Sequence, residues 1–255
     1  NKASRKKTGL EAVNVEKRIR AREAGLSFGE HPTGATNTIV DVPGVSVGHV
    51  TLIKGSGKLR PGHGPVRTGV TVILPHRGNI YAEKVAAACH VINGYGKSAG
   101  LIQVEELGVI ETPIALTNTL NVGLVMDGIV EYMTRTNQAL MSVNPLVLEC
   151  NDGFLNDIRG RHVKQAHVLE AIENALRKPS LEEGAVGAGT GMSAFGFKGG
   201  IGTASRRLET PAGTYTLGAL VLTNFGRRRD LTIKGVPVGR HLQGYPEGSR
   251  EGSII

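Results

Sequence analysis

The chain has little of what marks several classes of protein. Only two of its 255 residues are cysteines, Cys89 and Cys150, too few for a disulfide framework and at a spacing that fits no zinc knuckle. Aromatic residues make up 4%, with no tryptophan. No apolar run approaches the roughly eighteen residues that a membrane-spanning helix needs. These shortages exclude a disulfide-stapled domain and a helical membrane protein.

Glycine is abundant at 36 residues, about twice its ordinary share. The net charge of +8 is concentrated at one end, because residues 1–22 hold eight basic and two acidic side chains and the remaining 233 residues hold 22 and 20. We therefore interpret residues 1–25 as a basic arm and residues 26–255 as a single domain. Few aromatics are available to stack bases and no recognition-helix pattern follows, so we expect no nucleic-acid partner. The arm lacks the apolar core of a secretory signal, which favours a cytoplasmic location.

Strand and helix patterns alternate along the rest of the chain, which predicts a mixed α and β fold. Apolar residues at helical spacing predict helices, and runs rich in β-branched residues predict strands. The predicted strands are two short ones within 36–50, around a turn at Pro43-Gly44, and others at 69–74, 112–116, 145–148 and 214–223. The predicted helices are 83–91, 122–133 and 164–176.

Glycine-rich segments invite a search for phosphate-binding motifs, and two fail on spacing. Gly96-Lys97-Ser98 has the tail of a Walker loop, but Val91 stands where its first glycine belongs. In the glycine-rich stretch 184–202, a dinucleotide motif starting at Gly187 would need glycine at Met192. Two interpretations of this stretch stay open: its backbone amides hold an oxyanion or a phosphate, or its glycines turn the chain between sheets.

Other chemistries find weak support. The eight histidines show no H-E-x-x-H and no carboxylate-paired spacing, so we expect no metal site. Cys150, beside Glu149, is interpreted either as a thiol nucleophile or as a small buried hydrophobe, and the second interpretation is favoured. A Gly-Ser pair at 252–253, followed by two isoleucines, is unremarkable alone, because Gly55-Ser56 and Gly248-Ser249 also occur.

Taken together, nine segments resemble a known family in collinear order from about residue 30 to residue 255. The chain is similar to the DmpA/BapA family of self-processing L-aminopeptidase/D-esterases and β-peptidyl aminopeptidases. The segments are NTIVDVPGVSVG (37–48), TGVTVILP (68–75), TNT (117–119), ECNDGFLND (149–157), GAGTGM (187–192), FKGGIGTAS (197–205), LVLTN (220–224), LTIKGVPVG (231–239) and GSII (252–255).

The resemblance implies an α-β-β-α four-layer sandwich, like that of N-terminal-nucleophile hydrolases but with different connectivity. It implies a precursor that cuts itself between Gly252 and Ser253 and then releases N-terminal residues from short peptides, amides or esters, without a metal or cofactor. The chemistry is coherent, because the freed α-amine of Ser253 titrates near pH 8 and can act as the base for its own hydroxyl.

The resemblance also assigns roles to three further residues. Asn224 matches the asparagine whose amide donates to the tetrahedral oxyanion, a donor worth about 3 kcal/mol in the barrier. Glu149 matches the carboxylate that holds the substrate's free ammonium. Asn151 stands where some members carry a tyrosine as a second oxyanion donor, and it is shorter. The glycine-rich loop is expected to pack against the nucleophile.

The family's chain continues past the serine, and the later segment supplies a further Ser and Glu. We therefore expect residues 26–255 to be the α-chain portion, completed by a β chain from the same precursor. By analogy, αβ units form a homo-oligomer. Two alternatives stay open: an acyltransferase like the fold-related ornithine acetyltransferase, which cleaves itself at a threonine, and an inactive scaffold of the same fold.

Overall fold

A computed structural model describes residues 19–177, 181–242, 244, 247–248 and 252–255. The chain divides into two compact units, residues 1–30 and residues 31–255. In the first unit, the described residues hold a turn in which the amide of Ala24 donates to the carbonyl of Arg20 at 3.1 Å. The boundary between arm and domain that the sequence places at residue 25 stays a prediction. The helices and sheets of the described residues all belong to residues 31–255.

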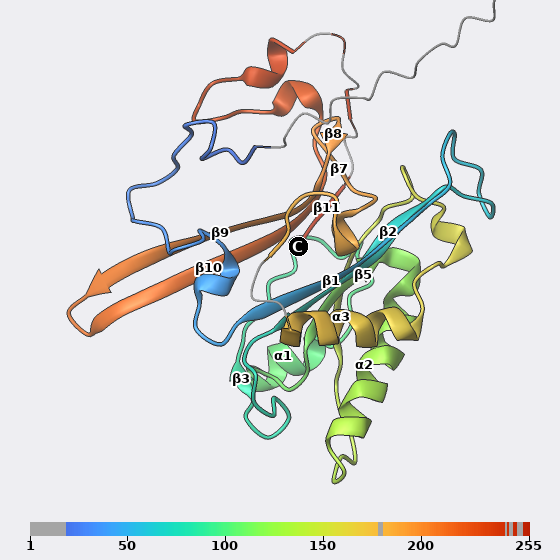
Figure 1. Ribbon diagram of the computed structural model, residues 1–255, viewed down its shortest axis with the longest axis vertical. Helices are drawn as coiled ribbons and strands as arrows, with labels where there is room; N and C mark the ends of the chain where they lie inside the picture. Colours follow the sequence, from blue (N-terminus) through green and yellow to red (C-terminus); the bar gives the residue numbers. More distant parts are fainter. Residues whose placement is uncertain (1–18, 178–180, 243, 245–246, 249–251) are drawn as a thin grey trace, which may run out of the picture. The chain divides into compact units, whose positions relative to one another are not determined.

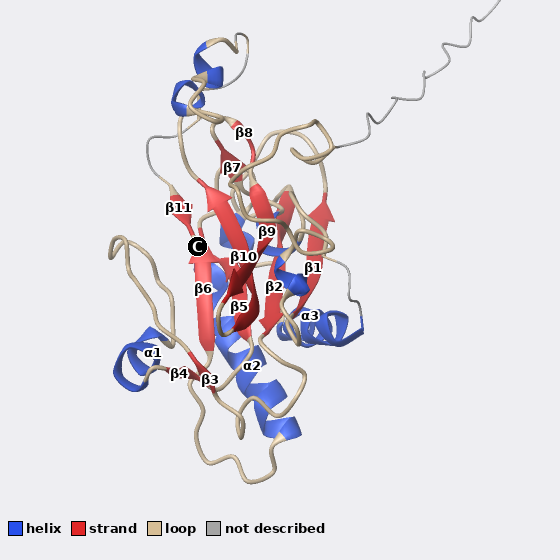
Figure 2. Cartoon of the chain, turned by 90° about the vertical axis from the view of Figure 1, so that its left-hand side faces the viewer, coloured by secondary structure: helices blue, strands red, loops and turns tan. Residues whose placement is uncertain are grey.

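The first sheet has four strands in the order β1-β2-β5-β6, antiparallel except for the parallel pair β5–β6 (Figure 2). The helix α2 (Val122–Thr136) connects β5 to β6. The parallel register carries both strands to a shared end, where Asn118 lies opposite Cys150. The strands are β1 (Ser46–Lys54), β2 (Val66–Leu74), β5 (Ile114–Asn118) and β6 (Leu146–Cys150).

The helices α2 and α3 (Gln165–Arg177) cover one face of this sheet (Figure 1). Both follow the predicted helical spacing, and their buried residues, among them Ile129 and Ile172, pack with Val70 and Val72 of β2. Burying each such aliphatic side chain contributes about 2 kcal/mol, which is what holds the helical layer to the sheet.

The second sheet packs on the other face of the first (Figure 2). It has the order β11-β10-β9 and comprises β9 (Gly200–Thr210), β10 (Gly213–Asn224) and β11 (Ser253–Ile254). The core between the sheets gathers Ile201 and Leu222 from the second sheet with Leu116 and Cys150 from the first. The layers are therefore helix, sheet and sheet.

The outer face of the second sheet is apolar and uncovered by any helix of the described residues. Tyr215, Leu217 and Val221 alternate along β10 with exposures of 54%, 61% and 36%. In a strand with one buried face, alternate residues point outward, and large apolar ones there indicate a surface that needs a cover.

Short elements fill the connections. They are α1 (Leu101–Leu107), β3 (Val85–Ala86), β4 (Val109–Ile110), β7 (Ser193–Ala194) and β8 (Phe197–Lys198), with 3-10 turns at Ile39–Asp41 (η1), Thr119–Asn121 (η2), Ile158–Gly160 (η3), Gly187–Gly189 (η4), Arg228–Asp230 (η5) and Val238–Arg240 (η6).

Two of the predicted elements are wrong. The alanine-rich segment 83–91 is not helical, because Val85–Ala86 pairs with Val109–Ile110 as β3 and β4, and tertiary pairing overrides helix propensity. The first of the two strands predicted within 36–50 is instead the 3-10 turn η1. There the carboxylate of Asp41 accepts hydrogen bonds from the amides of Thr36 and Thr38, at 3.0 and 3.1 Å, and curls the segment.

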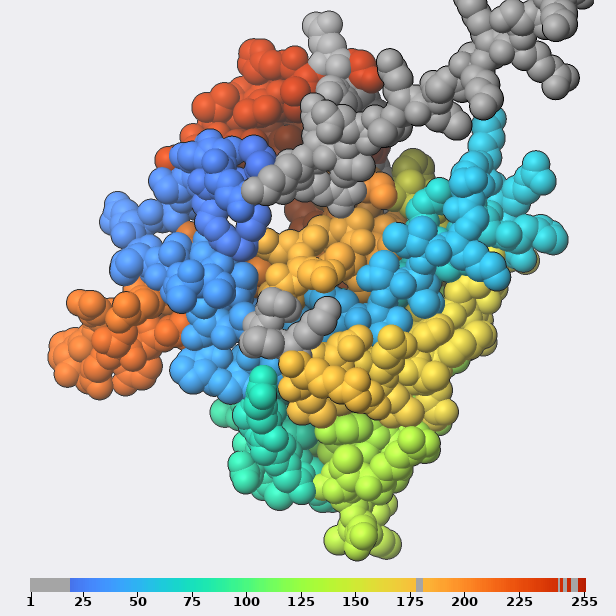
Figure 3. Space-filling view, in the orientation of Figure 1, coloured from blue at the N-terminus to red at the C-terminus, as the bar shows by residue number. Residues whose placement is uncertain are grey.

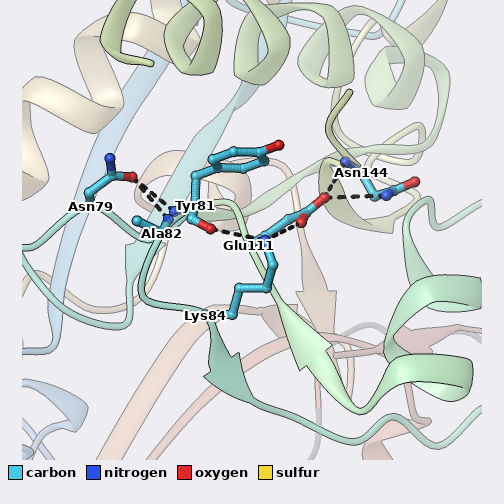
Figure 4. A network of polar contacts seen from close by, with 6 residues as sticks. All are labelled: Asn79, Tyr81, Ala82, Lys84, Glu111 and Asn144. Carbon is cyan, nitrogen blue, oxygen red and sulfur yellow. Dashed lines mark hydrogen bonds and ion pairs between the residues drawn. The ribbon is translucent and has the colours of Figure 1, made fainter. Parts of the chain in front are cut away.

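An ion pair between the exposed Lys84 and the buried Glu111 closes the end of the first sheet where β5 and β6 begin (Figure 4). The ammonium of Lys84 donates to Glu111 Oε2 at 2.7 Å, and Glu111 Oε1 accepts from the amide of Asn144 at 3.0 Å. Burial alone would raise the pKa of Glu111, but these hydrogen bonds outweigh it and lower the pKa. The stability that this carboxylate gives is therefore present at neutral pH and is lost as the pH falls through its lowered pKa.

Replacing Lys84 with methionine is expected to destabilise the fold by about 2 kcal/mol, because a carboxylate with 7% exposure loses its only cation among the described residues. Urea unfolding measures the change. The matched control is Arg135→Ala, which removes the exposed partner of Glu131 on α2 and is expected to cost less than about 0.5 kcal/mol. Equal losses in the two variants would show that the Lys84–Glu111 pair stabilises no more than a surface pair.

Candidate active site

Ser253 and Asn224 face each other across the edge of the second sheet. The antiparallel register of β11 on β10 places Ser253 directly opposite Asn224 and Ile254 opposite Thr223. Directly opposed residues of an antiparallel pair put their side chains on the same face, with Cβ atoms about 5 Å apart. Leu222, two residues before Asn224, packs in the core between the sheets, so both side chains point into that space.

The side-chain amide of Asn224 is fixed from two sides. Its Oδ1 accepts a hydrogen bond from the amide of Ser193 at 3.0 Å, and its Nδ2 donates to the carbonyl of Asn151 at 2.6 Å. An amide nitrogen carries two hydrogens, and the described residues offer no acceptor for the second. The side-chain amide of Asn224 is therefore held in place opposite Ser253, with one N–H that the described residues leave unused.

The thiol of Cys150 lies beneath the serine. Cys150 ends β6, is fully buried, and its Sγ donates to the carbonyl of Leu222 at 3.7 Å. Burial and, to a smaller extent, the charge of Glu149 raise the pKa of the thiol to about 12, against a hydrogen bond with the Ser253 side chain that lowers it. Cys150 is fully buried among the apolar residues between the sheets, which agrees with the favoured interpretation of a small buried residue.

Gly252 is packed too tightly for any side chain. A Cβ at this position would stand 2.3 Å from the carbonyl oxygen of Asn224 and 2.5 Å from the Cα of Phe225. Only glycine lets the chain approach the end of β10 this closely just before Ser253. The glycine of the Gly-Ser pair is thus required by packing.

The glycine-rich loop passes between the two sheets. Gly187 has a φ of +51°, and a Cβ there would stand 2.3 Å from Thr71 Oγ1. The amides of Gly187 and Ala188 donate to the hydroxyls of Thr51 and Thr71, at 2.8 and 3.1 Å. These amides are therefore used inside the fold, which favours a loop that turns the chain between sheets over one that holds an anion. The loop leads into Ser193, whose amide contacts Asn224.

Glu149 precedes Cys150 in β6, so its side chain leaves the strand on the opposite face. It is 7% exposed, and it accepts hydrogen bonds from the amide of Lys97 at 3.1 Å and from the hydroxyl of Thr119. No basic side chain among the described residues pairs with it. The structure brings Ser253 and Asn224 together on the inner face of the second sheet. Glu149 lies near the end of β6 in the first sheet, with its side chain on the face opposite to that of Cys150.

The loop after β6 is held by buried polar groups. Asn151 keeps its side chain in a local turn, with Oδ1 accepting from the amide of Gly153 at 2.9 Å, while its carbonyl accepts from Asn224. Asp152 is fully buried and accepts from Asn156 Nδ2 at 2.9 Å. Burial raises the pKa of Asp152 to about 6, against the hydrogen bonds of Thr68 and Asn156. Asp152 and Asn156 thus hold the segment that presents the Asn151 carbonyl.

The sequence did not indicate the contact of the Cys150 thiol with Ser253, the contact of the Ser193 amide with Asn224, or the buried carboxylate of Asp152. The first two are contacts between segments distant in the chain, for which a single sequence carries no signal. Asp152 lies two residues after β6, in the segment where the resemblance indicated Glu149 and Asn151. Among the described residues, no three His, Cys, Asp or Glu side chains gather as a metal site requires. None of the described helices is long and apolar enough to cross a membrane.

Known proteins share this arrangement. The β-peptidyl aminopeptidase BapA of Sphingosinicella microcystinivorans is 48% identical over 225 residues, covering 88% of this chain and 56% of the relative. The crystal structure of the PH0078 protein from Pyrococcus horikoshii OT3 superposes with a TM-score of 0.88 at 61% identity, covering 93% of this chain and 67% of that one. The L-aminopeptidase D-Ala-esterase/amidase of Ochrobactrum anthropi, a prototype for the serine aminopeptidases, gives 0.80 at 41% identity, covering 89% and 63%.

The last of these structures is a variant of the N-terminal-nucleophile hydrolase fold, and the two stacked sheets with Ser253 at their edge place this chain in the same class. The predicted fold class is confirmed. Residues 37–255 match the model of peptidase family S58, and the chain belongs to that family. It spans 56% of the length of the BapA relative and 57% of its Sphingosinicella xenopeptidilytica counterpart.

Proposed function

We propose that this chain is the nucleophile-bearing part of a serine aminopeptidase that becomes active when the bond between Gly252 and Ser253 is cut. The observation that carries the proposal is the register of β11 on β10, which sets the Ser253 hydroxyl opposite the fixed amide of Asn224. Membership in peptidase family S58 supports the same reaction class.

Self-cleavage begins when the Ser253 hydroxyl attacks the carbonyl carbon of Gly252. The oxyanion forms beside Asn224, the C–N bond breaks, and the hydroxyl proton passes to the leaving nitrogen, which leaves an ester on Oγ. Water then hydrolyses the ester, which leaves a carboxylate on Gly252 and makes Ser253 the first residue of a new chain, with a free hydroxyl and a free α-amine. The new α-amine serves as general base when the same hydroxyl attacks a substrate, and Asn224 again donates to the oxyanion.

Glu149 is proposed to hold the ammonium of the substrate's first residue. Its support is electrostatic: a carboxylate with 7% exposure has two hydrogen-bond donors but no cationic partner among the described residues. Buried carboxylates are ordinarily paired, and a substrate ammonium entering past the end of β6 supplies the pair. Asn151, at the same end, is proposed to line the substrate site.

The test compares amino-acid p-nitroanilides with free and with acetylated amines. The processed enzyme is expected to release p-nitroaniline from the free-amine substrates alone. Glu149→Gln is expected to lower kcat/KM for them by about 30-fold, the loss of one charge-assisted hydrogen bond. The exposed Glu106→Gln on α1 is the matched control. Equal turnover of acetylated and free-amine substrates by the unmodified enzyme would remove the aminopeptidase assignment.

We further propose that a β chain from the same precursor completes the molecule and that αβ units assemble into a homo-oligomer. The support is the apolar outer face of β10 and the share of the curated relatives that the chain spans. A helical layer on that face would make up the four-layer sandwich. A cytoplasmic location stays a prediction of the sequence.

A further inference from the structure

The loop between β1 and β2 forms the wall of a basic pocket that is remote from Ser253 in the sequence. The cavity measures about 620 Å³. Its lining comes from two segments: residues 54–66, which form the loop between β1 and β2 with its flanking strand ends and are called the hairpin below, and the stretch after η3. The lining residues are Lys54, Gly55, Ser56, Gly57, Lys58, Arg60, His63, Gly64, Pro65, Val66 and His162.

The charge of this pocket is one-sided. Three full cations, Lys54, Lys58 and Arg60, and two histidines line it, with no acidic side chain and no phenylalanine, tyrosine or tryptophan. None of the three cations has a carboxylate partner among the described residues. Beyond its basic arm the chain is nearly balanced, with 22 basic and 20 acidic residues, so this concentration is a local feature of the fold.

The back of the pocket is braced by Asp157. This buried carboxylate accepts hydrogen bonds from the amide of Gly62 at 2.7 Å and from His162 Nε2 at 3.0 Å. The hydrogen bond from Gly62 and the contact with His162 lower its pKa. Asp157 thereby ties the hairpin to the segment after η3. Because Nε2 of His162 donates to Asp157, Nδ1 is an acceptor in the neutral ring and donates to an anion only when the ring is protonated.

The hairpin is also closed on itself. Arg60 and Gly64 exchange backbone hydrogen bonds of 2.8 and 3.2 Å, and the amide of His63 donates to the Arg60 carbonyl at 2.9 Å. The light-blue hairpin stands out from the body of the second unit in Figure 3. Its backbone is therefore held by local hydrogen bonds and by Asp157. The side chains of Lys54, Lys58 and Arg60 are exposed and extend from this fixed backbone.

We propose that this pocket binds a small, multiply charged oxyanion, namely inorganic pyrophosphate or the diphosphate group of a small molecule. Three unpaired cations call for more negative charge than one carboxylate carries, and lysine and arginine are the usual ligands of phosphate oxygens. The lining holds no phenylalanine, tyrosine or tryptophan, the usual platforms for a stacked base, so the proposal takes the diphosphate group itself as the recognised part.

The test titrates pyrophosphate into protein expressed from the complete gene, by calorimetry at 0.15 M KCl. Lys58→Ala/Arg60→Ala is expected to weaken binding about 100-fold, because each of the two charge-assisted hydrogen bonds to the anion contributes about tenfold to the affinity. The matched control, Lys6→Ala/Lys7→Ala, removes the same charge from the basic arm and is expected to change Kd less than about twofold. Both pairs are in exposed or terminal positions, and thermal unfolding checks that the fold is intact.

Two results would overturn the proposal. Either the unmodified protein shows no saturable binding of pyrophosphate, or the two double variants lose the same affinity, which would show attraction to net charge alone. A third titration with acetate is expected to show no binding, and binding of acetate as tight as that of pyrophosphate would also count against a multiply charged ligand. None of these readouts uses peptidase turnover, so the result is independent of the proposed function.

Discussion

Protein expressed from the complete gene with Ser253→Ala is expected to remain a single uncut chain without aminopeptidase activity. The alanine has no hydroxyl to attack the Gly252 carbonyl, and without cleavage no α-amine is freed to act as base. Intact-mass spectrometry measures the outcome directly: the unmodified protein is expected to give two fragments divided between Gly252 and Ser253, and the variant one. Turnover is expected to fall by at least about 10⁴-fold, the usual cost of removing a nucleophile.

The chain supplies its own matched control for this experiment. Ser249 also follows a glycine, four residues upstream, so Ser249→Ala removes the same hydroxyl from a neighbouring Gly-Ser pair. That variant is expected to divide at residue 253 like the unmodified protein. If the Ser253→Ala protein were still cut between residues 252 and 253, Ser253 would not be the nucleophile. If Ser249→Ala prevented or displaced the cut, the proposed junction would be wrong.

Asn224→Ala is expected to lower kcat of the processed enzyme by about 10²–10³-fold with a small change in KM, because one donor to the oxyanion is lost in the transition state and not in the ground state. The same loss is expected to slow self-cleavage, since both reactions pass through an oxyanion at this position. Time-resolved mass spectrometry of the precursor and steady-state kinetics of the mature enzyme measure the two effects.

Asn137→Ala, at the end of α2, serves as the comparison for Asn224→Ala, because it removes an equivalent amide far from Ser253 in the sequence. Its kinetics are expected to match those of the unmodified enzyme. An Asn224→Ala enzyme with unchanged kcat and a raised KM would assign the residue to ground-state binding in place of catalysis.

The elements that could be predicted from sequence are those whose local pattern agrees with their tertiary role. The β-branched run 69–74 lies within β2, and the spaced apolar residues of 122–133 form the buried stripe of α2. The prediction for the alanine-rich segment 83–91 was wrong because its backbone pairs with Val109–Ile110, a pairing to which propensity is blind.

The residues of the candidate site fall into the same two groups: those that the sequence indicated and those that depend on tertiary packing. Resemblance indicated Ser253 and Asn224, and their register across β10 and β11 is consistent with those roles. The positions of the Cys150 thiol under Ser253 and of the Asn151 carbonyl on Asn224 depend on how β6 meets the second sheet. A single sequence does not show how β6 packs against the second sheet, because the residues in contact are more than 70 positions apart in the chain.

Two backbone hydrogen bonds that hold the end of the chain to β10 lie beyond the bond that is proposed to be cut. Leu222 and Ile255 donate to each other's carbonyls at 2.9 and 3.1 Å, and Ile255 packs with Leu222 in the core between the sheets. Scission before residue 253 breaks none of these contacts. If the chain is cut there, as proposed, the new terminus is expected to stay hydrogen-bonded to β10, with Ser253 already opposite Asn224 before the first substrate binds.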